Sequence, residues 1–209
     1  AQFGVADAAQ LILARAEGKS LRAIGVVYRR SPLVFVSLAE AGITRPQDIV
    51  GKTVRITPEV APAFHAMMGH VGVTPDQYTE VNVPSDIAIF ASGDPAVWGV
   101  FINGFVVAAR QAGYALNLIY PDDYGVHFYS DTLFTTDDLT ATNPALVRRF
   151  LRATLKGWTY AVENPAQAGA LTQKYNAAAD AALENARMTA ALPLVNTGED
   201  NIGWMKADV

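Results

Sequence analysis

The alternation that decides the fold runs through residues 52–120, KTVRITPEVAPAFHAMMGHVGVTPDQYTEVNVPSDIAIFASGDPAVWGVFINGFVVAARQAGYALNLIY. Short apolar stretches of strand-forming residues are separated here by stretches whose apolar side chains recur at helical spacing. The expected strands are Thr53–Ile56, Thr79–Val83, Val97–Ile102 and Leu116–Tyr120, and the expected helices are Pro62–His70, Ser85–Ala91 and Gly104–Gln111. Because strands that alternate with helices favour a mostly parallel sheet covered on both faces, the sequence predicts an α/β fold.

Two β-rich runs flank this block, at residues 22–38 and 126–136. Each predicts extended backbone at one border of the alternating pattern, and after residue 136 the pattern is almost entirely helical. The simplest arrangement is two lobes joined by two crossing segments. We therefore expect one lobe from residues 1–37 and 126–209, and a second lobe from residues 38–125.

Composition and charge exclude several classes of protein. The 209 residues hold 16 Lys and Arg against 20 Asp and Glu, a net charge of −4, without the basic patch of a nucleic-acid-binding protein. The absence of cysteine rules out disulfides, cysteine nucleophiles, iron–sulfur clusters and thiolate zinc sites. The first residues, Ala1–Val5, predict a buried strand with nothing before it to pair with, so we expect the natural chain to start earlier.

Candidate ligand-binding residues follow from the strand ends and the crossing segments. In parallel α/β sheets, ligands bind beyond the carboxyl ends of strands, where loops and helix N-termini present free N–H groups. Phenol rings, an arginine and carboxylates together suit a flat polar heterocycle held by stacking and a few hydrogen bonds. The candidates are Asp7, Thr57, Glu59, Asn103 and Tyr124 at strand ends, and Tyr28, Arg29, Ser31, Tyr129 and Asp131 on the crossing segments.

Several candidates also have a simpler structural interpretation. Asp7 and Ser85 stand where a helix N-cap is expected, and such residues are often caps alone. Tyr28 and Tyr129 lie in β-rich runs, where aromatic residues are common as packing residues. Arg29 could equally be solvated at the surface. The sequence leaves these alternatives open.

The three histidines do not suggest a metal site. His65 and His70 are five residues apart, about 140° around a helix, whereas the HExxH arrangement needs both on one face. His127 stands alone and is expected to be structural. No motif for covalent or phosphoryl-transfer catalysis occurs, so no catalytic residue, metal or cofactor is predicted.

Five segments carry a resemblance to a known family, and they span nearly the whole chain in the family's order. They are FGVADAAQLILARAEG at 3–18, GITRPQDIVGKTVRIT at 42–57, VWGVFINGFVV at 97–107, DYGVHFYSDTLFTT at 123–136 and NPALVRRFLRATLKGWTYAVENPAQA at 143–168. Through them the chain resembles the type 2 periplasmic solute-binding proteins of ABC transporters, in the branch shared with fungal thiamine-pyrimidine synthase. This resemblance implies a two-lobed type 2 periplasmic-binding-protein fold whose first lobe is incomplete at its N-terminus.

The resemblance also bears on individual residues. Tyr129 and Asp131 fall in the segment where the pyrimidine-binding members of this family have an aromatic residue followed by an acidic one. The resemblance therefore implies that these residues stack on a ring and form hydrogen bonds with it. Asn103 falls where the family often has an Asn-Glu pair, but Gly104 follows it here, so no carboxylate is available at that position.

By this resemblance the protein is expected to be a non-enzymatic, extracytoplasmic receptor that captures a thiamine pyrimidine precursor or a riboflavin-like molecule by lobe closure. The expected partner is an ABC permease. The expected location is periplasmic or extracellular, and one form of the protein there would be held by a lipid anchor. A homodimer that covers the incomplete lobe is a further expectation. Two alternatives stay open: a receptor for anions such as sulfonates or nitrate that uses Arg29, and a pyrimidine synthase that uses His127 or His65. The missing cysteine cluster argues against the synthase.

Overall fold

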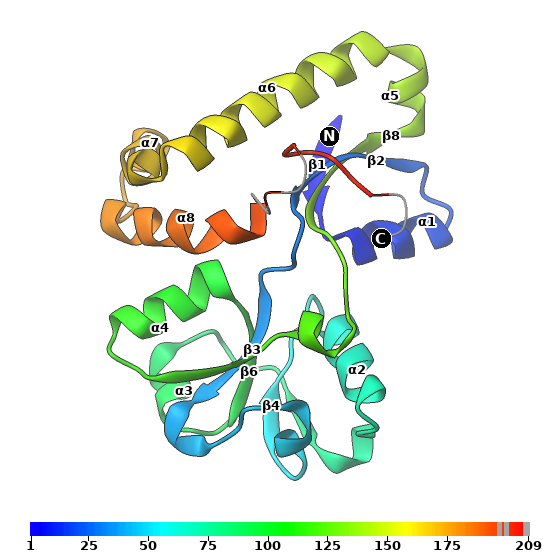
Figure 1. Cartoon of the computed structure of the whole chain (residues 1–209). Helices are drawn as coiled ribbons and strands as arrows, with labels where there is room; N and C mark the ends of the chain where they lie inside the picture. The colour runs from blue at the N-terminus through cyan, green and yellow to red at the C-terminus, as the bar shows by residue number, and fades with distance from the viewer. Residues whose placement is uncertain (196–197, 199–200, 207–209) are drawn as a thin grey trace. The chain divides into compact units, whose positions relative to one another are not determined.

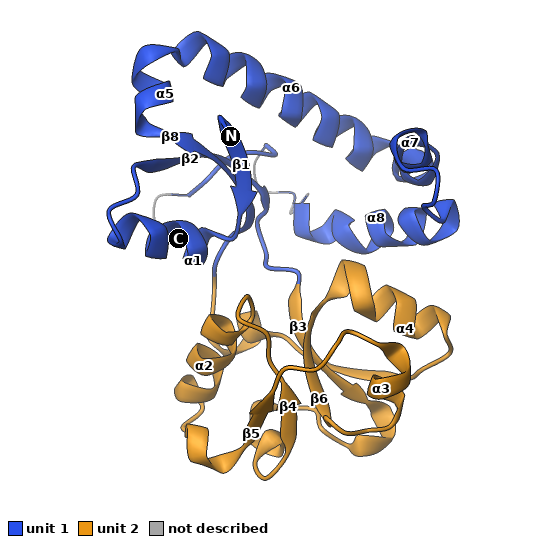
Figure 2. Cartoon of the chain, turned by 180° about the vertical axis from the view of Figure 1, so that it is seen from behind, with its two compact units in different colours: residues 1–32, 128–209 blue, residues 33–127 orange. Residues whose placement is uncertain are grey.

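The chain folds into two compact units, drawn in different colours in Figure 2. The computed structural model describes residues 1–195, 198 and 201–206. Unit 1 consists of residues 1–32 and 128–209, and unit 2 of residues 33–127. The borders expected from the sequence therefore need correction, because residues 33–37 and 126–127 belong to unit 2.

Pairing explains both corrections. Strand β3 (Leu33–Leu38) was expected to belong to the first lobe, but it is hydrogen-bonded to two strands of unit 2. At the other border, the Val126 N–H donates to the Pro121 carbonyl at 3.1 Å, and the His127 ring contacts Asp122. The run 22–38 thus contains two strands from two different sheets.

Unit 2 is built on a five-stranded sheet in the order β5-β4-β6-β3-β7. The other four strands are β4 (Thr53–Arg55), β5 (Thr79–Val81), β6 (Val97–Phe101) and β7 (Leu116–Ile119). Strand β4 runs parallel to β5 and β6, whereas β3 runs antiparallel to β6 and β7. The predicted α/β class is confirmed, with one antiparallel strand inside a sheet that is otherwise parallel. Figure 1 labels β3, β4 and β6 of this sheet.

The helices of unit 2 are short, and aromatic side chains fill the space beneath them. They are α2 (Ala61–His70), α3 (Ile87–Ala91), α4 (Val107–Gln111), the π-helical turn η4 (Ile102–Val106), and the 3₁₀ turns η1 (Ala39–Ala41), η2 (Pro46–Ile49), η3 (Pro75–Gln77) and η5 (Pro121–Tyr124). The Trp98 ring is fully buried, with the rings of Phe90 and Phe105 at centroid distances of 5.5 and 5.4 Å. Asp86, rather than Ser85, caps α3, because its carboxylate accepts from the Ala88 N–H at 2.7 Å.

Unit 1 contains a three-stranded antiparallel sheet in the order β1-β8-β2. Its strands are β1 (Phe3–Ala6), β2 (Leu21–Tyr28) and β8 (Ser130–Thr136). Its helices are α1 (Ala8–Ala16), α5 (Asp137–Thr142), α6 (Pro144–Glu163), α7 (Ala168–Tyr175) and α8 (Ala181–Val195), with the 3₁₀ turn η6 (Pro165–Gln167). Among all the described residues of the chain, no helix is both long enough and apolar enough to cross a lipid bilayer.

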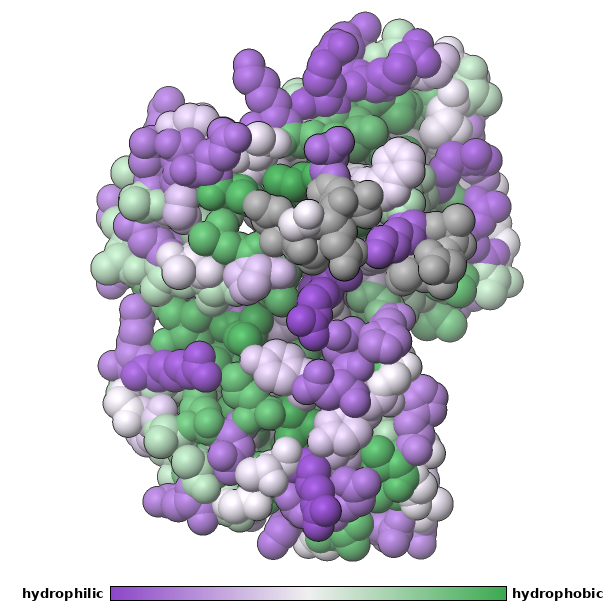
Figure 3. Space-filling view, in the orientation of Figure 1, coloured by the Kyte–Doolittle hydropathy of each residue, from purple (hydrophilic) through white to green (hydrophobic). Residues whose placement is uncertain are grey.

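Helix α6 packs its apolar face on the sheet and presents its polar face to solvent. Asn143 caps it by accepting from the Leu146 N–H at 3.1 Å, as the Asn-Pro sequence indicates. The Phe150 ring stacks on Phe3 of β1 with a centroid distance of 3.8 Å. Figure 3 shows hydrophilic side chains along the outer side of this helix, which carries the exposed residues Arg148, Arg149, Arg152 and Lys156.

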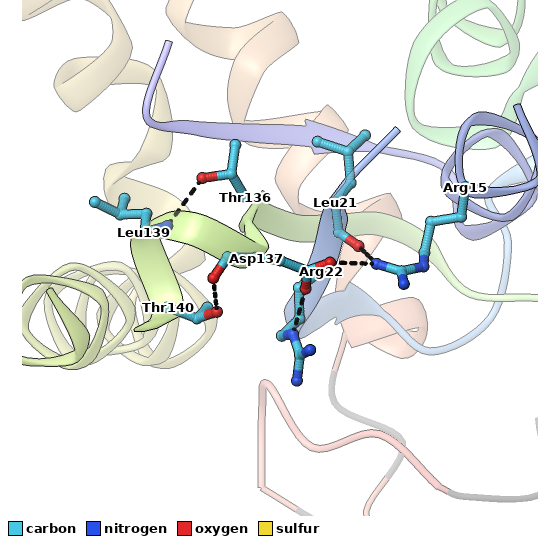
Figure 4. A network of polar contacts seen from close by, with 7 residues as sticks. All are labelled: Arg15, Leu21, Arg22, Thr136, Asp137, Leu139 and Thr140. Atoms are coloured by element: carbon cyan, nitrogen blue, oxygen red, sulfur yellow. Dashed lines mark hydrogen bonds and ion pairs between the residues drawn. The ribbon is translucent and has the colours of Figure 1, made fainter. Parts of the chain in front are cut away.

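A polar network around Asp137 joins α1, β2 and the start of α5 (Figure 4). The Asp137 carboxylate accepts from Arg22 at 2.7 Å and from Arg15 at 3.0 Å, and Arg15 also donates to the Leu21 carbonyl. These two arginines hold the pKa of the Asp137 carboxyl below its ordinary value, with the Arg22 hydrogen bond as the larger cause. The network therefore ties together chain segments more than 100 residues apart.

Candidate functional site

Asp7 and Ser130 connect the end of β1 to the start of β8. The Ser130 hydroxyl donates a hydrogen bond to the Asp7 carboxylate, and the backbone joins the same two segments where the Ala8 N–H donates to the Tyr129 carbonyl at 3.1 Å. The Asp7 side chain makes no capping bond to α1. The capping interpretation of Asp7 is therefore wrong, and its carboxylate faces β8 instead.

Asp131 is the residue next to this bond, and it has two unusual features. Its backbone φ is 47°, in the left-handed region that few residues other than glycine, asparagine and aspartate adopt. Burial raises the pKa of its carboxyl, and the negative charge of Asp7 raises it further. Two of the predicted site carboxylates, Asp7 and Asp131, are thus near enough for the charge of Asp7 to act on Asp131, and we call them the acid pair.

The two predicted tyrosines of unit 1 are both largely buried. Tyr129 is 9% exposed, and its hydroxyl accepts from the Lys206 backbone N–H at 2.9 Å. Tyr28 is 6% exposed, and its ring meets the Trp158 ring edge-on at 6.0 Å between centroids. The contact with Trp158 favours the packing interpretation for Tyr28, whereas Tyr129 is two residues before Asp131 and its carbonyl accepts from the N–H of Ala8, the residue after Asp7.

Arg29 and Ser31 follow β2, at the end of the first chain segment of unit 1. The Arg29 guanidinium donates to the Asn201 carbonyl at 3.4 Å, and its backbone N–H donates to the Leu194 carbonyl at 2.9 Å. Arg29 is therefore anchored to the C-terminal part of the chain rather than solvated alone. Ser31 is partly buried, next to the buried Pro32.

The remaining four candidates belong to unit 2. Thr57 and Glu59 follow β4, and a hydrogen bond from the Thr57 hydroxyl lowers the pKa of the Glu59 carboxyl. Asn103 lies in the π-helical turn after β6 and is partly exposed. Tyr124 ends η5, and its carbonyl accepts from the His70 ring at 2.9 Å.

Arg55, which the sequence analysis did not single out, lies at the carboxyl end of β4. It is 8% exposed, and its guanidinium donates to the carbonyls of Val83 at 2.8 Å and Gly99 at 3.3 Å. Burial lowers the pKa of this guanidinium, and the charge of Glu59 opposes that effect. A signal was present, because a charged residue inside the apolar strand TVRI must find buried partners.

The histidine contacts do not assemble a metal centre. His65 contacts the Glu80 carboxylate at 2.7 Å, and His127 contacts the Asp122 carboxylate at 2.6 Å. Over residues 1–195 and the described positions beyond them, no group of three or more potential protein ligands is close enough to hold a metal ion.

Comparison with known proteins adds three relatives in sequence. They are the riboflavin-binding protein RibY of Chloroflexus aurantiacus (24% identity, 83% of this chain and 50% of the relative), the formylaminopyrimidine-binding protein of Halalkalibacterium halodurans (30%, 76% and 49%), and the 4-amino-5-hydroxymethyl-2-methylpyrimidine phosphate synthase of Legionella pneumophila (28%, 79% and 54%). The chain therefore spans about half the length of the curated relatives it matches. Two of these relatives are named as binding proteins and one as a synthase.

A solved structure confirms the fold. The periplasmic aliphatic sulphonate-binding protein SsuA from Escherichia coli matches with a TM-score of 0.75 at 15% identity, over 90% of this chain and 65% of that chain. The expected type 2 periplasmic-binding-protein fold is thereby confirmed, and at this identity the likeness shows the fold alone. Residues 1–168 match the family described as NMT1/THI5 like. Since this match covers well over half of the chain, the protein belongs to the NMT1/THI5-like family.

Proposed function

We propose that the protein is the solute-binding component of an ABC importer, and that it captures a small heterocycle, either a thiamine pyrimidine precursor or a riboflavin-like molecule. The names of two relatives, a riboflavin-binding protein and a formylaminopyrimidine-binding protein, support this ligand class. Closure of the lobes on the ligand is part of the proposal, since a ligand that contacts both lobes favours a closed state for a permease to recognise.

The observation that carries the ligand class is the acid pair Asp7 and Asp131. Burial of the Asp131 carboxyl and the nearby negative charge of Asp7 both raise the pKa of Asp131, so its negative form is costly to hold there. A ring amine or ring N–H donates hydrogen bonds to a carboxylate and relieves this cost, whereas an anion would increase it. The pair is therefore suited to an amino-substituted or N–H-bearing ring.

The anion alternative has less support from the same residues. A sulfonate bound near the acid pair would meet two carboxylates. Arg29, the cation that this alternative invokes, already donates to the Asn201 carbonyl.

The synthase alternative invokes two histidines, His65 and His127. Each of them contacts a carboxylate, and no observation favours a reactive role for either.

Thermal unfolding against a ligand panel tests the proposal. The panel holds formylaminopyrimidine, the hydroxymethyl aminopyrimidine, riboflavin, an alkanesulfonate and nitrate. A ligand at 100 times its dissociation constant adds about 2.7 kcal/mol to the free energy of unfolding, a shift that is easily measured. We expect pyrimidine or flavin to stabilise the protein. Stabilisation by sulfonate alone, weakening with added salt, would establish the alternative, and no response to pyrimidine or flavin would refute the proposal.

Variants of the acid pair sharpen the test. Asp131→Asn keeps the left-handed backbone accessible but removes the charge, so it should weaken binding of the stabilising ring at least tenfold. The matched control is Asp123→Asn, an exposed aspartate in η5 of unit 2, which should leave binding unchanged. Turnover is checked separately: a pyrimidine product formed from pyridoxal phosphate and iron, detected by mass spectrometry, would favour the synthase.

The proposal also includes three predictions: that the protein works with an ABC permease, that it is periplasmic or extracellular, and that it forms a homodimer. X-ray scattering with and without the stabilising ligand measures closure, since a closed form has a smaller radius of gyration. Sedimentation velocity measures the oligomeric state of the same sample.

A further inference from the structure

Residues 201–206, NIGWMK, form a segment that we call the C-terminal strap. Three hydrogen bonds dock the strap on unit 1, where Figure 1 draws it beside the sheet. The Val26 N–H donates to the Gly203 carbonyl at 3.3 Å, the Arg29 guanidinium to the Asn201 carbonyl at 3.4 Å, and the Lys206 N–H to the Tyr129 hydroxyl at 2.9 Å. Two of these three contacts are made by residues of the candidate site.

Close packing at Gly203 fixes the path of the strap. This glycine has a φ of 94°, and a Cβ placed on it would lie only 2.6 Å from a methyl group of Leu155 in α6. A Cβ on Gly25 of β2 would in turn lie 3.3 Å from the Gly203 carbonyl oxygen. A turn bond follows, from the Trp204 N–H to the Asn201 carbonyl at 3.1 Å. The strap therefore has a defined conformation against β2 and α6.

Trp204 is held between these anchors with its side chain in solvent. It is 61% exposed, whereas Trp98 is fully buried and Trp158 is partly buried against Tyr28. Its Cα lies at most about 7.6 Å from that of Lys206, the residue bonded to the Tyr129 hydroxyl. An exposed indole on a fixed backbone offers a flat apolar surface at low conformational cost, which is what a planar ring needs for stacking.

We propose that Trp204 is a ligand-contacting residue that stacks on the planar ring of the heterocycle bound beside Tyr129. This inference rests on the proposed function and assigns the stacking surface to the strap rather than to the two tyrosines. The tyrosine rings are 6% and 9% exposed, so they offer little face for a ligand, while the indole is open. The hydroxyl of Tyr129 acts here as a positioning group, because it holds the strap.

The test compares Trp204→Ala with Trp204→Phe, using formylaminopyrimidine and riboflavin as the probes in calorimetric titration. Loss of a stacking face should weaken binding of whichever probe the wild-type protein takes by about tenfold or more in Trp204→Ala, and by less than threefold in Trp204→Phe. Tyr175→Ala is the control, because Tyr175 is 84% exposed on α7 of the same unit and should not change affinity.

Fluorescence gives an independent readout. Formylaminopyrimidine should quench the tryptophan emission of the wild-type protein and leave the emission of Trp204→Phe nearly unchanged, although that variant still binds. Equal affinity of Trp204→Ala and wild type for a probe that binds would overturn the inference alone. If the wild-type protein binds neither these probes nor the hydroxymethyl aminopyrimidine of the panel, the proposed function fails and the inference fails with it. Circular dichroism confirms that each variant is folded.

Discussion

The guanidinium of Arg55 lies 4.9 Å from the centroid of the Trp98 ring, over the aromatic face, and joins β4 to β6 and to the segment that follows β5. Its hydrogen bonds reach the Val83 carbonyl after β5 and the Gly99 carbonyl in β6, while Arg55 itself ends β4. Arg55→Met should therefore lower the free energy of unfolding by about 3 kcal/mol, since two carbonyls lose a charged donor at a buried position. Urea denaturation measures this loss.

Two further variants separate the buried contacts from charge alone. Arg55→Lys keeps the charge but cannot reach both carbonyls with a planar group, so it should recover only part of the lost stability. Arg110→Met removes an exposed arginine from the last turn of α4 and should change stability by less than about 0.5 kcal/mol. Equal effects of Arg55→Met and Arg110→Met would contradict the structural role of Arg55.

Asp131 should make the protein less stable as the pH rises. Because burial and the Asp7 charge raise the pKa of Asp131 in the folded state, the unfolded chain loses this proton at a lower pH than the folded protein. The contribution of the protonated Asp131 to the free energy of unfolding is therefore fully present below the unfolded pKa of about 3.9 and is lost as the pH rises through the folded pKa. Asp131→Asn should accordingly be more stable than wild type at pH 7, and the difference should vanish in acid. Chemical denaturation at a series of pH values measures it.

The acid pair predicts that stability and binding respond in opposite directions. Asp131→Asn should gain stability at pH 7 while losing affinity for the ring ligand, as happens where a site is kept at a cost to stability. A variant that is less stable than wild type at pH 7 would show that the carboxylate is satisfied within the fold.

The network of Figure 4 predicts the opposite pH dependence. The pKa of Asp137 is lowered by Arg22 and then by Arg15, so its contribution to stability is present above the unfolded pKa and is lost as the pH falls through the folded pKa. Asp137→Asn should be less stable than wild type at neutral pH, with a difference that shrinks in acid and in high salt. Asp138→Asn, at the next position in the first turn of α5, is the control and should show a smaller loss.

Two glycines in helices should respond to alanine with opposite signs. A Cβ on Gly169 of α7 would lie 2.7 Å from the Cα of Ala181 and closer still to its carbonyl oxygen, so Gly169→Ala should cost about 2–3 kcal/mol of stability. Around Gly157 of α6 nothing lies within 4 Å of such a Cβ, and Gly157→Ala should add about 0.5–1 kcal/mol by favouring the helix. Thermal unfolding of both variants checks the signs.

Much of the fold follows from local pattern, and what the pattern missed depends on distant partners. The strands of residues 52–120 lie close to their predicted positions, because apolar runs bounded by glycine and proline have few other structures to form. The run 22–38 does not show locally that its halves enter different sheets, since the Arg29–Pro32 interruption could also be a bulge in one strand. The sequence also does not decide whether Ser85 or Asp86 caps α3, because the two residues are adjacent and both types favour the N-cap position. In the structure the Asp86 carboxylate forms the capping bond.

The candidate site was predictable to a similar extent. The sequence singled out Asp7, Tyr129 and Asp131, which the fold brings next to one another because β1 and β8 pair. It did not anticipate that the C-terminal strap bonds to Tyr129 and Arg29, because a link across more than 70 residues leaves no periodic trace. Arg55 was detectable in principle, as the lone charge within an apolar strand.

The insertion of unit 2 between the two halves of unit 1 has a consequence for synthesis. As the polypeptide leaves the ribosome, residues 33–127 are complete before β8 exists, so the inserted unit can acquire its core first. Strands β1 and β2 share no direct pairing and must wait for β8, the strand that lies between them. During translation, the carboxylates of Asp7 and Asp131 therefore come together only after the whole of unit 2 has emerged.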